Sequence, residues 1–196
     1  MKVNKNNSWS TTHYTFKCSE PQNDKLQEKI LQMEKDGLGF QFDPAQGGGW
    51  QSDKDLLNSD EFVFKSLRKV LLNYTNQILS EIYIDDATIK IINSWANIGR
   101  KGESTMPHIH EQASWSLVYY VTHTGNANLY FKDPRTLESM DRSHQYLRKP
   151  YANVIRKKPF DAGVAILFPS WLEHGVVTNM TDDIRISIAC NFLIEG

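Results

Sequence analysis

The chain has 196 residues, of which 40% are hydrophobic, with 22 basic and 23 acidic side chains and a formal net charge of −1. This length suits one domain with a sizeable core, and the balanced charge excludes bulk attraction to nucleic acid or to an anionic membrane. Two cysteines without a Cys-x-x-Cys motif exclude a disulfide framework and a thiolate zinc site.

The ends and the general pattern of the chain predict a cytoplasmic protein. The first residues lack the apolar run of a signal peptide. No segment approaches the roughly 20 apolar residues of a membrane helix. Two unpaired thiols fit a reducing compartment. Without a linker or an internal repeat, residues 1–196 are expected to form one domain, in which 1–85 is a helical brace and 86–196 is the metal-binding core.

The first 85 residues carry two helical patterns. A short edge strand is expected near residues 14–17, and the first helix should follow it, capped by Asn23 or Asp24 and running to about Asp36.

The second helix has the stronger pattern. Its apolar side chains recur at steps of three and four residues up to about Tyr83, and Ser59 is expected to be its N-cap. The apolar face needs a partner, for which the outer face of a sheet is suitable. Between the helices, residues 47–50 (Gly-Gly-Gly-Trp) predict a loop and lack the Gly-Lys-Ser/Thr of a phosphate-binding loop.

Residues 86–196 have a different character, with short β-branched and aromatic segments separated by turn residues. The expected strands are residues 88–95, 115–121, 128–131, 154–155, 163–168, 175–178 and 185–193. Such closely spaced short strands indicate an antiparallel sandwich or barrel rather than a parallel sheet.

Three histidines in this part form a candidate metal site. His108 and His110 are two residues apart, so on one strand both imidazoles would point to the same side. His174 follows a Pro-Ser turn 66 positions later, where a loop side chain can reach the mouth of a barrel. A single histidine usually has an ordinary polar role. The joint pattern predicts the site, and we assign none to His13, His123 and His144.

Arg185 is a candidate anchor for an anion. It lies 11 positions after His174 at the start of the last expected strand, and Ser187 should face the same way. A guanidinium matches a carboxylate through two parallel hydrogen bonds, and it is costly to bury without such a partner. Together with the histidines, this pair suggests a ligand that chelates a metal ion at one end and carries a carboxylate at the other.

Several motifs together resemble a known family. They are His108-x-His110, Ser-Leu-Val-Tyr-Tyr-Val at 116–121, Leu-Tyr-Phe-Lys-Asp-Pro-Arg at 129–135, Gly-Val-Ala-Ile-Leu-Phe-Pro-Ser-Trp-Leu-Glu-His at 163–174 and Arg-Ile-Ser-Ile at 185–188. In this order and spacing they are similar to the Fe(II)/2-oxoglutarate-dependent oxygenases, in the bacterial and phage branch related to prolyl hydroxylases. The resemblance covers roughly residues 89–192.

The resemblance implies a mainly β fold, a double-stranded β-helix (jelly roll, cupin-like) braced by the two N-terminal helices. It implies Fe(II) on His108, His110 and His174, with 2-oxoglutarate on the iron and its far carboxylate on Arg185, helped by Ser187. One of Tyr119, Tyr120 and Tyr130, with Tyr130 preferred, is a further candidate for binding the cosubstrate, and so is Asn93. The family chemistry uses dioxygen to decarboxylate 2-oxoglutarate to succinate and usually hydroxylates a substrate C–H bond.

Some alternatives stay open on the sequence. The wider superfamily has a carboxylate two positions after the first histidine, where this chain has His110, so Glu111 is an alternative ligand if a bulge turns it inward. The basic segment 132–158 is either a solvated insertion or a lid over an anionic substrate. A non-catalytic jelly-roll binding or structural module, and a cupin-like metalloenzyme without 2-oxoglutarate, are the rival functions. The substrate is open between a prolyl peptide, an amino acid, a nucleobase and a sugar, and so is a homodimer.

Overall fold

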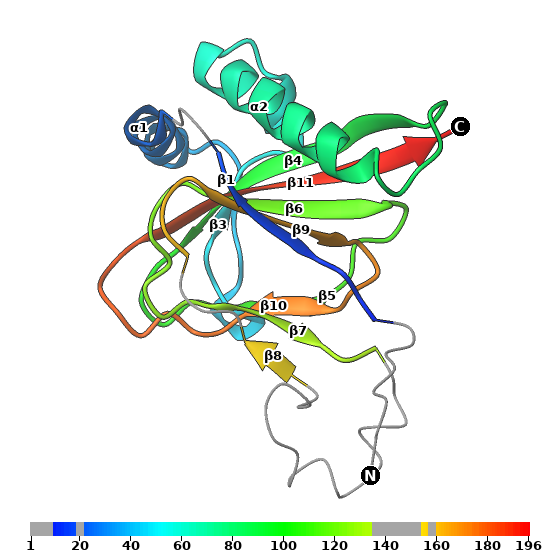
Figure 1. The fold of residues 1–196 in the computed structure, drawn as a ribbon. Helices are drawn as coiled ribbons and strands as arrows, with labels where there is room; N and C mark the ends of the chain where they lie inside the picture. The colour runs from blue at the N-terminus through cyan, green and yellow to red at the C-terminus, as the bar shows by residue number, and fades with distance from the viewer. Residues whose placement is uncertain (1–9, 19–21, 135–153, 157–159) are drawn as a thin grey trace, which may run out of the picture.

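The computed structural model describes residues 10–18, 22–134, 154–156 and 160–196. Two β-sheets face one another, and two helices cover the outer side of the larger sheet (Figure 1). This is the mainly antiparallel, helix-braced jelly roll that the sequence predicted. No helix among the described residues is both long and apolar enough to span a bilayer.

The larger sheet has seven strands in the order β1-β9-β6-β11-β4-β3-β2, and the smaller has four in the order β5-β10-β7-β8. Pairs between these strands are antiparallel. The strands of the larger sheet are β1 (Tyr14–Lys17), β2 (Phe40–Gln41), β3 (Trp50–Gln51), β4 (Thr88–Gly99), β6 (Trp115–Tyr120), β9 (Val164–Pro169) and β11 (Arg185–Glu195). Those of the smaller sheet are β5 (Thr105–His108), β7 (Leu129–Lys132), β8 (Val154–Arg156) and β10 (His174–Val176).

The N-terminal part does more than supply helices. Its strands β1, β2 and β3 all join the larger sheet, whereas the sequence predicted only the first of them. Strands β2 and β3 have two residues each, too short to show an alternating pattern. Trp50, expected at the end of a loop, begins β3 and pairs with Ile98.

Helix α2 (Phe62–Leu79) packs its apolar face on the larger sheet as expected. Phe64, Leu67 and Leu71 are buried in one cluster with sheet residues. Each such side chain contributes about 1.5–3 kcal/mol through burial. Helix α1 (Asn23–Lys35) adds Leu26 and Ile30 to the same cluster and lies close to its expected range.

The expected ends of α2 were wrong at both sides. Glu61 is the N-cap residue, and Ser59 instead closes a short 3-10 turn (Leu56–Asn58) by donating its N–H to the Leu56 carbonyl. The turn forms there because Leu56 and Leu57 are buried in the core. The helix ends at Leu79.

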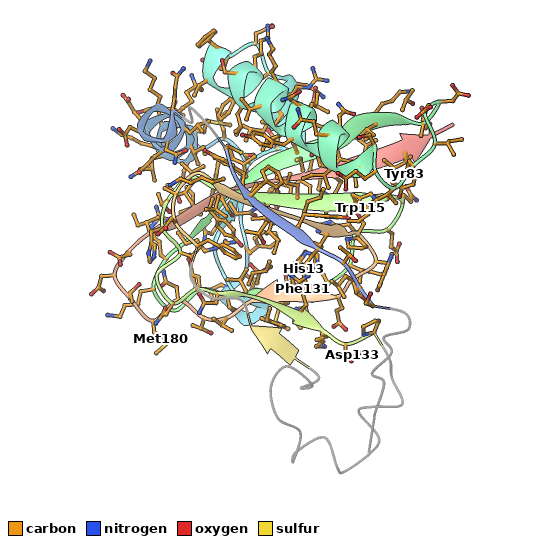
Figure 2. All side chains as sticks on the ribbon, viewed as in Figure 1. His13, Tyr83, Trp115, Phe131, Asp133 and Met180 are labelled. Carbon is orange, nitrogen blue, oxygen red and sulfur yellow. The ribbon has the colours of Figure 1, made fainter. Side chains whose placement is uncertain are left out.

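Two side-chain contacts link elements that are far apart in the sequence (Figure 2). Beyond the end of α2, the Tyr83 hydroxyl accepts a hydrogen bond of 2.9 Å from Trp115 Nε1 on β6. Just before β1, the His13 ring lies 5.5 Å from the ring of Phe131 on β7, so the N-terminal strand bridges the two sheets.

Alternation along β11 gives the larger sheet two different faces. Ile186, Ile188 and Cys190 are in the cluster under the helices. Arg185 and Ser187 face the smaller sheet and line a cavity. The polar residues of β11 therefore lie between the sheets, where a site can form.

Candidate metal and cosubstrate site

The three predicted histidines converge between the sheets. His108 ends β5 and His174 begins β10, and the two residues are direct cross-strand partners. His110 lies in the loop after β5, where its backbone N–H donates to the Ser170 carbonyl at 3.0 Å. Their ligand atoms all lie within 4.8 Å of one another.

Two details of the sequence argument were wrong although the cluster was right. His110 is not on the same strand as His108, because the strand ends and the loop turns back towards Ser170. His174 is a strand residue rather than a loop residue. Glu111 is exposed and is not part of the cluster, which holds no carboxylate among the described residues.

Hydrogen bonds orient two of the imidazoles for metal binding. The Nδ1 atoms of His108 and His174 each lie 2.8 Å from a backbone carbonyl, of Met106 and Leu172 respectively. A carbonyl only accepts, so each Nδ1 carries the proton and each Nε2 keeps its lone pair. The Nε2 atoms of His110 and His174 are 3.3 Å apart. About 3 Å is expected for two nitrogens that share an ion at roughly 2.1 Å.

Burial lowers the pKa of two of the three imidazoles, those of His110 and His174. Burial, followed by the nearby His108, lowers the pKa of His110 to about 4. Burial is also the main cause that lowers the pKa of His174 to about 3. Near pH 7 both imidazoles are therefore neutral, with one N–H each, which is the form that binds a metal ion.

Arg185 lies in a buried polar pocket and has no carboxylate partner in the described part of the chain. It is 6% exposed, and burial lowers the pKa of its guanidinium. Its Nε and the Ser187 hydroxyl are buried without hydrogen-bond partners among the described residues. The buried Tyr120 hydroxyl lies beside the guanidinium and interacts with it. Buried donors usually have partners. The guanidinium and the two hydroxyls beside it fit the carboxylate of a small acid.

One cavity of about 900 Å³ joins the metal cluster to this pocket. It is lined by six of the seven predicted site residues, namely Asn93, His108, His110, His174, Arg185 and Ser187. The Asn93 Oδ1 is buried and has no hydrogen-bond partner among the described residues.

Tyr130 is the predicted residue that the structure does not bring to the cavity. Leu129 and Phe131 point inwards and are buried between the sheets, so Tyr130 points outwards. It lies across Gly175, where an added Cβ would be 2.6 Å from the Tyr130 hydroxyl.

Tyr120 is the tyrosine beside Arg185; it was one of the three tyrosines that the sequence offered, but Tyr130 was preferred. It is the direct cross-strand partner of Ser187, and the Arg185 guanidinium carbon is 5.5 Å from the centre of its ring. The pairing of β6 with β11 would have identified it, but strand register is not visible in one sequence.

The outer part of the cavity is rimmed by large apolar side chains. Phe40 and Phe42 lie with ring centres 4.9 Å apart, and Met106 and Ile109 are exposed beside the histidines. Exposed apolar groups on a cavity rim are typical of a ligand-binding site. The predicted basic segment 132–158 falls largely outside the described residues.

Comparison with known proteins assigns the family. A family model described as "Putative 2OG-Fe(II) oxygenase" matches residues 93–191, which is just over half of the chain. The chain belongs to this family. It is an Fe(II)- and 2-oxoglutarate-dependent oxygenase by family, as the motifs indicated. No curated protein matches the chain in sequence.

Solved structures share the fold of this oxygenase at low identity. The non-heme alpha ketoglutarate dependent carbocyclase SnoK from nogalamycin biosynthesis is 10% identical with a TM-score of 0.68, over 93% of this chain and 79% of that one. A Pseudomonas putida prolyl-4-hydroxylase is 13% identical with a TM-score of 0.64, over 94% of both chains. HygX from Streptomyces hygroscopicus, with nickel, 2-oxoglutarate and hygromycin B bound, is 10% identical with a TM-score of 0.61, over 93% of this chain and 82% of that one.

Proposed function

We propose that His108, His110 and His174 bind the ferrous ion of this oxygenase and that Arg185 binds the far carboxylate of 2-oxoglutarate. One observation carries the proposal: a metal-ligand cluster and a buried guanidinium, which has no carboxylate partner among the described residues, line the same cavity. When bound, ferrous iron supplies the binding and activation of dioxygen.

The protein positions 2-oxoglutarate and balances the charge at the metal site. Three imidazole ligands bring no negative charge to the ion, so a dianionic cosubstrate is strongly favoured there. Arg185 and Ser187 donate to the carboxylate at the other end, and the Tyr120 hydroxyl adds a third donor. Fixed at both ends, 2-oxoglutarate is held in one orientation against the metal site.

The primary substrate enters from the apolar rim. A cavity of about 900 Å³ is at the upper end of the range for drug-sized ligands, so it has room for a second molecule beside 2-oxoglutarate. We propose hydroxylation of a C–H bond as the outcome.

We also propose that residues 1–196 act as one domain, with 1–85 bracing 86–196, and that the protein works in the cytoplasm, where its two free, buried cysteines stay reduced.

The experiment that tests the proposal measures turnover of the cosubstrate. With Fe(II), 2-oxoglutarate and ascorbate, the protein should consume oxygen and release succinate, slowly without substrate and faster with a suitable one. His174→Ala is the matched control and should abolish both. No turnover, together with no effect of 2-oxoglutarate on a metal-centred absorption band, would contradict the proposal.

The same preparation separates the rival functions. A metalloenzyme that does not use 2-oxoglutarate would keep its activity in Arg185→Ala. A binding module without a metal would show no change in its thermal midpoint when Fe(II), Mn(II) or Co(II) is added, because only a ligand of the folded state raises stability.

A further inference from the structure

A buried chain of side chains leads away from His110. The Asn191 Nδ2 atom lies 3.3 Å from His110 Nδ1, and the Ser116 hydroxyl donates to Asn191 Oδ1 at 2.8 Å. The Ser116 Oγ is also 2.8 Å from the Ser170 Oγ. Asn191, Ser116 and Ser170 are each less than 5% exposed, so water does not replace these bonds.

Without a metal ion, the hydrogen bonds along these side chains all run in the same direction, from donor to acceptor. The Asn191 amide donates to His110 Nδ1, which places the His110 proton on Nε2. That N–H faces His174 Nε2 at 3.3 Å, and His174 Nε2 is an acceptor because its Nδ1 proton goes to a backbone carbonyl. Every group then donates towards His174, starting from Ser170.

A metal ion on His110 Nε2 requires the opposite direction. The His110 proton must move to Nδ1, which then needs an acceptor. A half-turn of the Asn191 amide puts Oδ1 at that place and turns Nδ2 towards Ser116. A hydroxyl both donates and accepts, so Ser116 can accept from the amide and donate to Ser170.

We propose that Asn191 is a positioning residue for His110 and that the chain Asn191–Ser116–Ser170 reverses its hydrogen-bond direction when a metal ion binds. The inference rests on the proposed metal-binding role of His110. His108 and His174 are oriented by backbone carbonyls, whereas the Nδ1 of His110 has, among the described residues, the Asn191 amide as its one hydrogen-bond partner. His110 therefore needs a side chain to orient it.

Metal affinity in two Asn191 variants tests the proposal. The probe is Co(II) alone, titrated into the full chain without 2-oxoglutarate and followed by its visible absorption. Asn191→Leu removes the acceptor and should weaken binding about 10–100-fold. Asn191→Asp accepts from both His110 and Ser116 without turning, so it should bind within a few-fold of the wild type, or more tightly. Equal loss in both variants would reduce Asn191 to a packing residue and overturn the proposal.

A matched pair of serine variants covers the case in which Asn191→Leu does not fold. Ser116→Ala removes the middle of the chain and should weaken Co(II) binding several-fold. Ser94→Ala deletes an equally buried hydroxyl, which accepts from the Leu57 N–H on the helix side of the sheet, and should leave Co(II) binding unchanged. Equal affinities in the two variants would overturn the proposal.

Nitrogen NMR of the histidine rings gives a readout that does not depend on affinity. On addition of Zn(II), the His110 proton should move from Nε2 to Nδ1 in the wild type. A proton already on Nδ1 in the metal-free protein would refute the reversal. Failure of the proposed function is distinguishable, because His174→Ala would then bind Co(II) as the wild type does.

Discussion

Replacement of Arg185 by methionine should separate stability from cosubstrate binding. Methionine keeps most of the side-chain length but removes the charge and all five donors. In the protein without ligands, the guanidinium is buried and its Nε has no hydrogen-bond partner within the described residues, so it costs stability rather than adding it. We therefore expect the free energy of unfolding of Arg185→Met to stay the same or to rise by about 1–3 kcal/mol.

The effect on 2-oxoglutarate should be large and of opposite sign. The substitution removes the two charge-assisted hydrogen bonds that a guanidinium donates to a carboxylate, each contributing about 1.5–3 kcal/mol. The dissociation constant should rise by a factor on the order of 100 or more. Anaerobic titration of 2-oxoglutarate into the Fe(II)-loaded protein, followed by the charge-transfer absorption band, measures this constant, and urea unfolding measures stability.

Arg68→Met is the matched control. Arg68 lies on α2, its Nε is likewise buried without a partner among the described residues, and it does not line the cavity. The same chemical change there should leave the 2-oxoglutarate affinity unchanged. If Arg185→Met instead destabilised the fold by several kcal/mol and bound 2-oxoglutarate normally, Arg185 would be a structural residue and the reasoning would be refuted.

Three further perturbations test other parts of the structure. His174→Ala should remove the rise in thermal midpoint that Co(II) produces in the wild type, and a persisting rise would place the metal elsewhere. Leu71 is fully buried between α2 and the larger sheet, so Leu71→Ala should lower the free energy of unfolding by about 2–5 kcal/mol and leave the turnover per folded molecule unchanged. A loss below about 1 kcal/mol would contradict this packing. Burial raises the pKa of the Cys18 thiol to about 11 and raises the pKa of Cys190 further, so neither should react with a thiol reagent at pH 8 until urea unfolds the chain. Because both pKa values are raised in the folded protein, the protonated thiols stabilise the fold fully below pH 9, and this stabilisation is lost as the pH rises, through about 11 for Cys18. Rapid labelling of the native protein at pH 8 would contradict the prediction.

Residue type and spacing predicted most of the site because its parts lie on strands. Arg185 and Ser187 were placed on one face by alternation, and both do face the cavity. The same rule also predicted that His110 lies near His108, as it does, but for a wrong reason, because His110 lies in a loop held by the Ser170 carbonyl. A loop conformation depends on contacts with distant residues, so local sequence does not contain it.

Two of the errors come from the pairing and burial of segments in the whole fold. Tyr120 rather than Tyr130 lies beside Arg185 because β6, and not β7, is next to β11 in the sheet. Ser59 was expected to cap a helix because nothing in its neighbourhood shows that Leu56 and Leu57 are drawn into the core. Pairing order and burial are properties of the whole fold, which short motifs do not record.

The two faces of the larger sheet separate folding from recognition. The helices cover one face with the larger hydrophobic cluster, while the other face carries the polar cavity wall. Exchanges at rim positions such as Phe40, Met106 and Ile109 therefore alter what the pocket accepts without weakening the buried support beneath it. This arrangement makes the rim the place to redirect the enzyme towards new substrates, by selection in nature or by design in the laboratory.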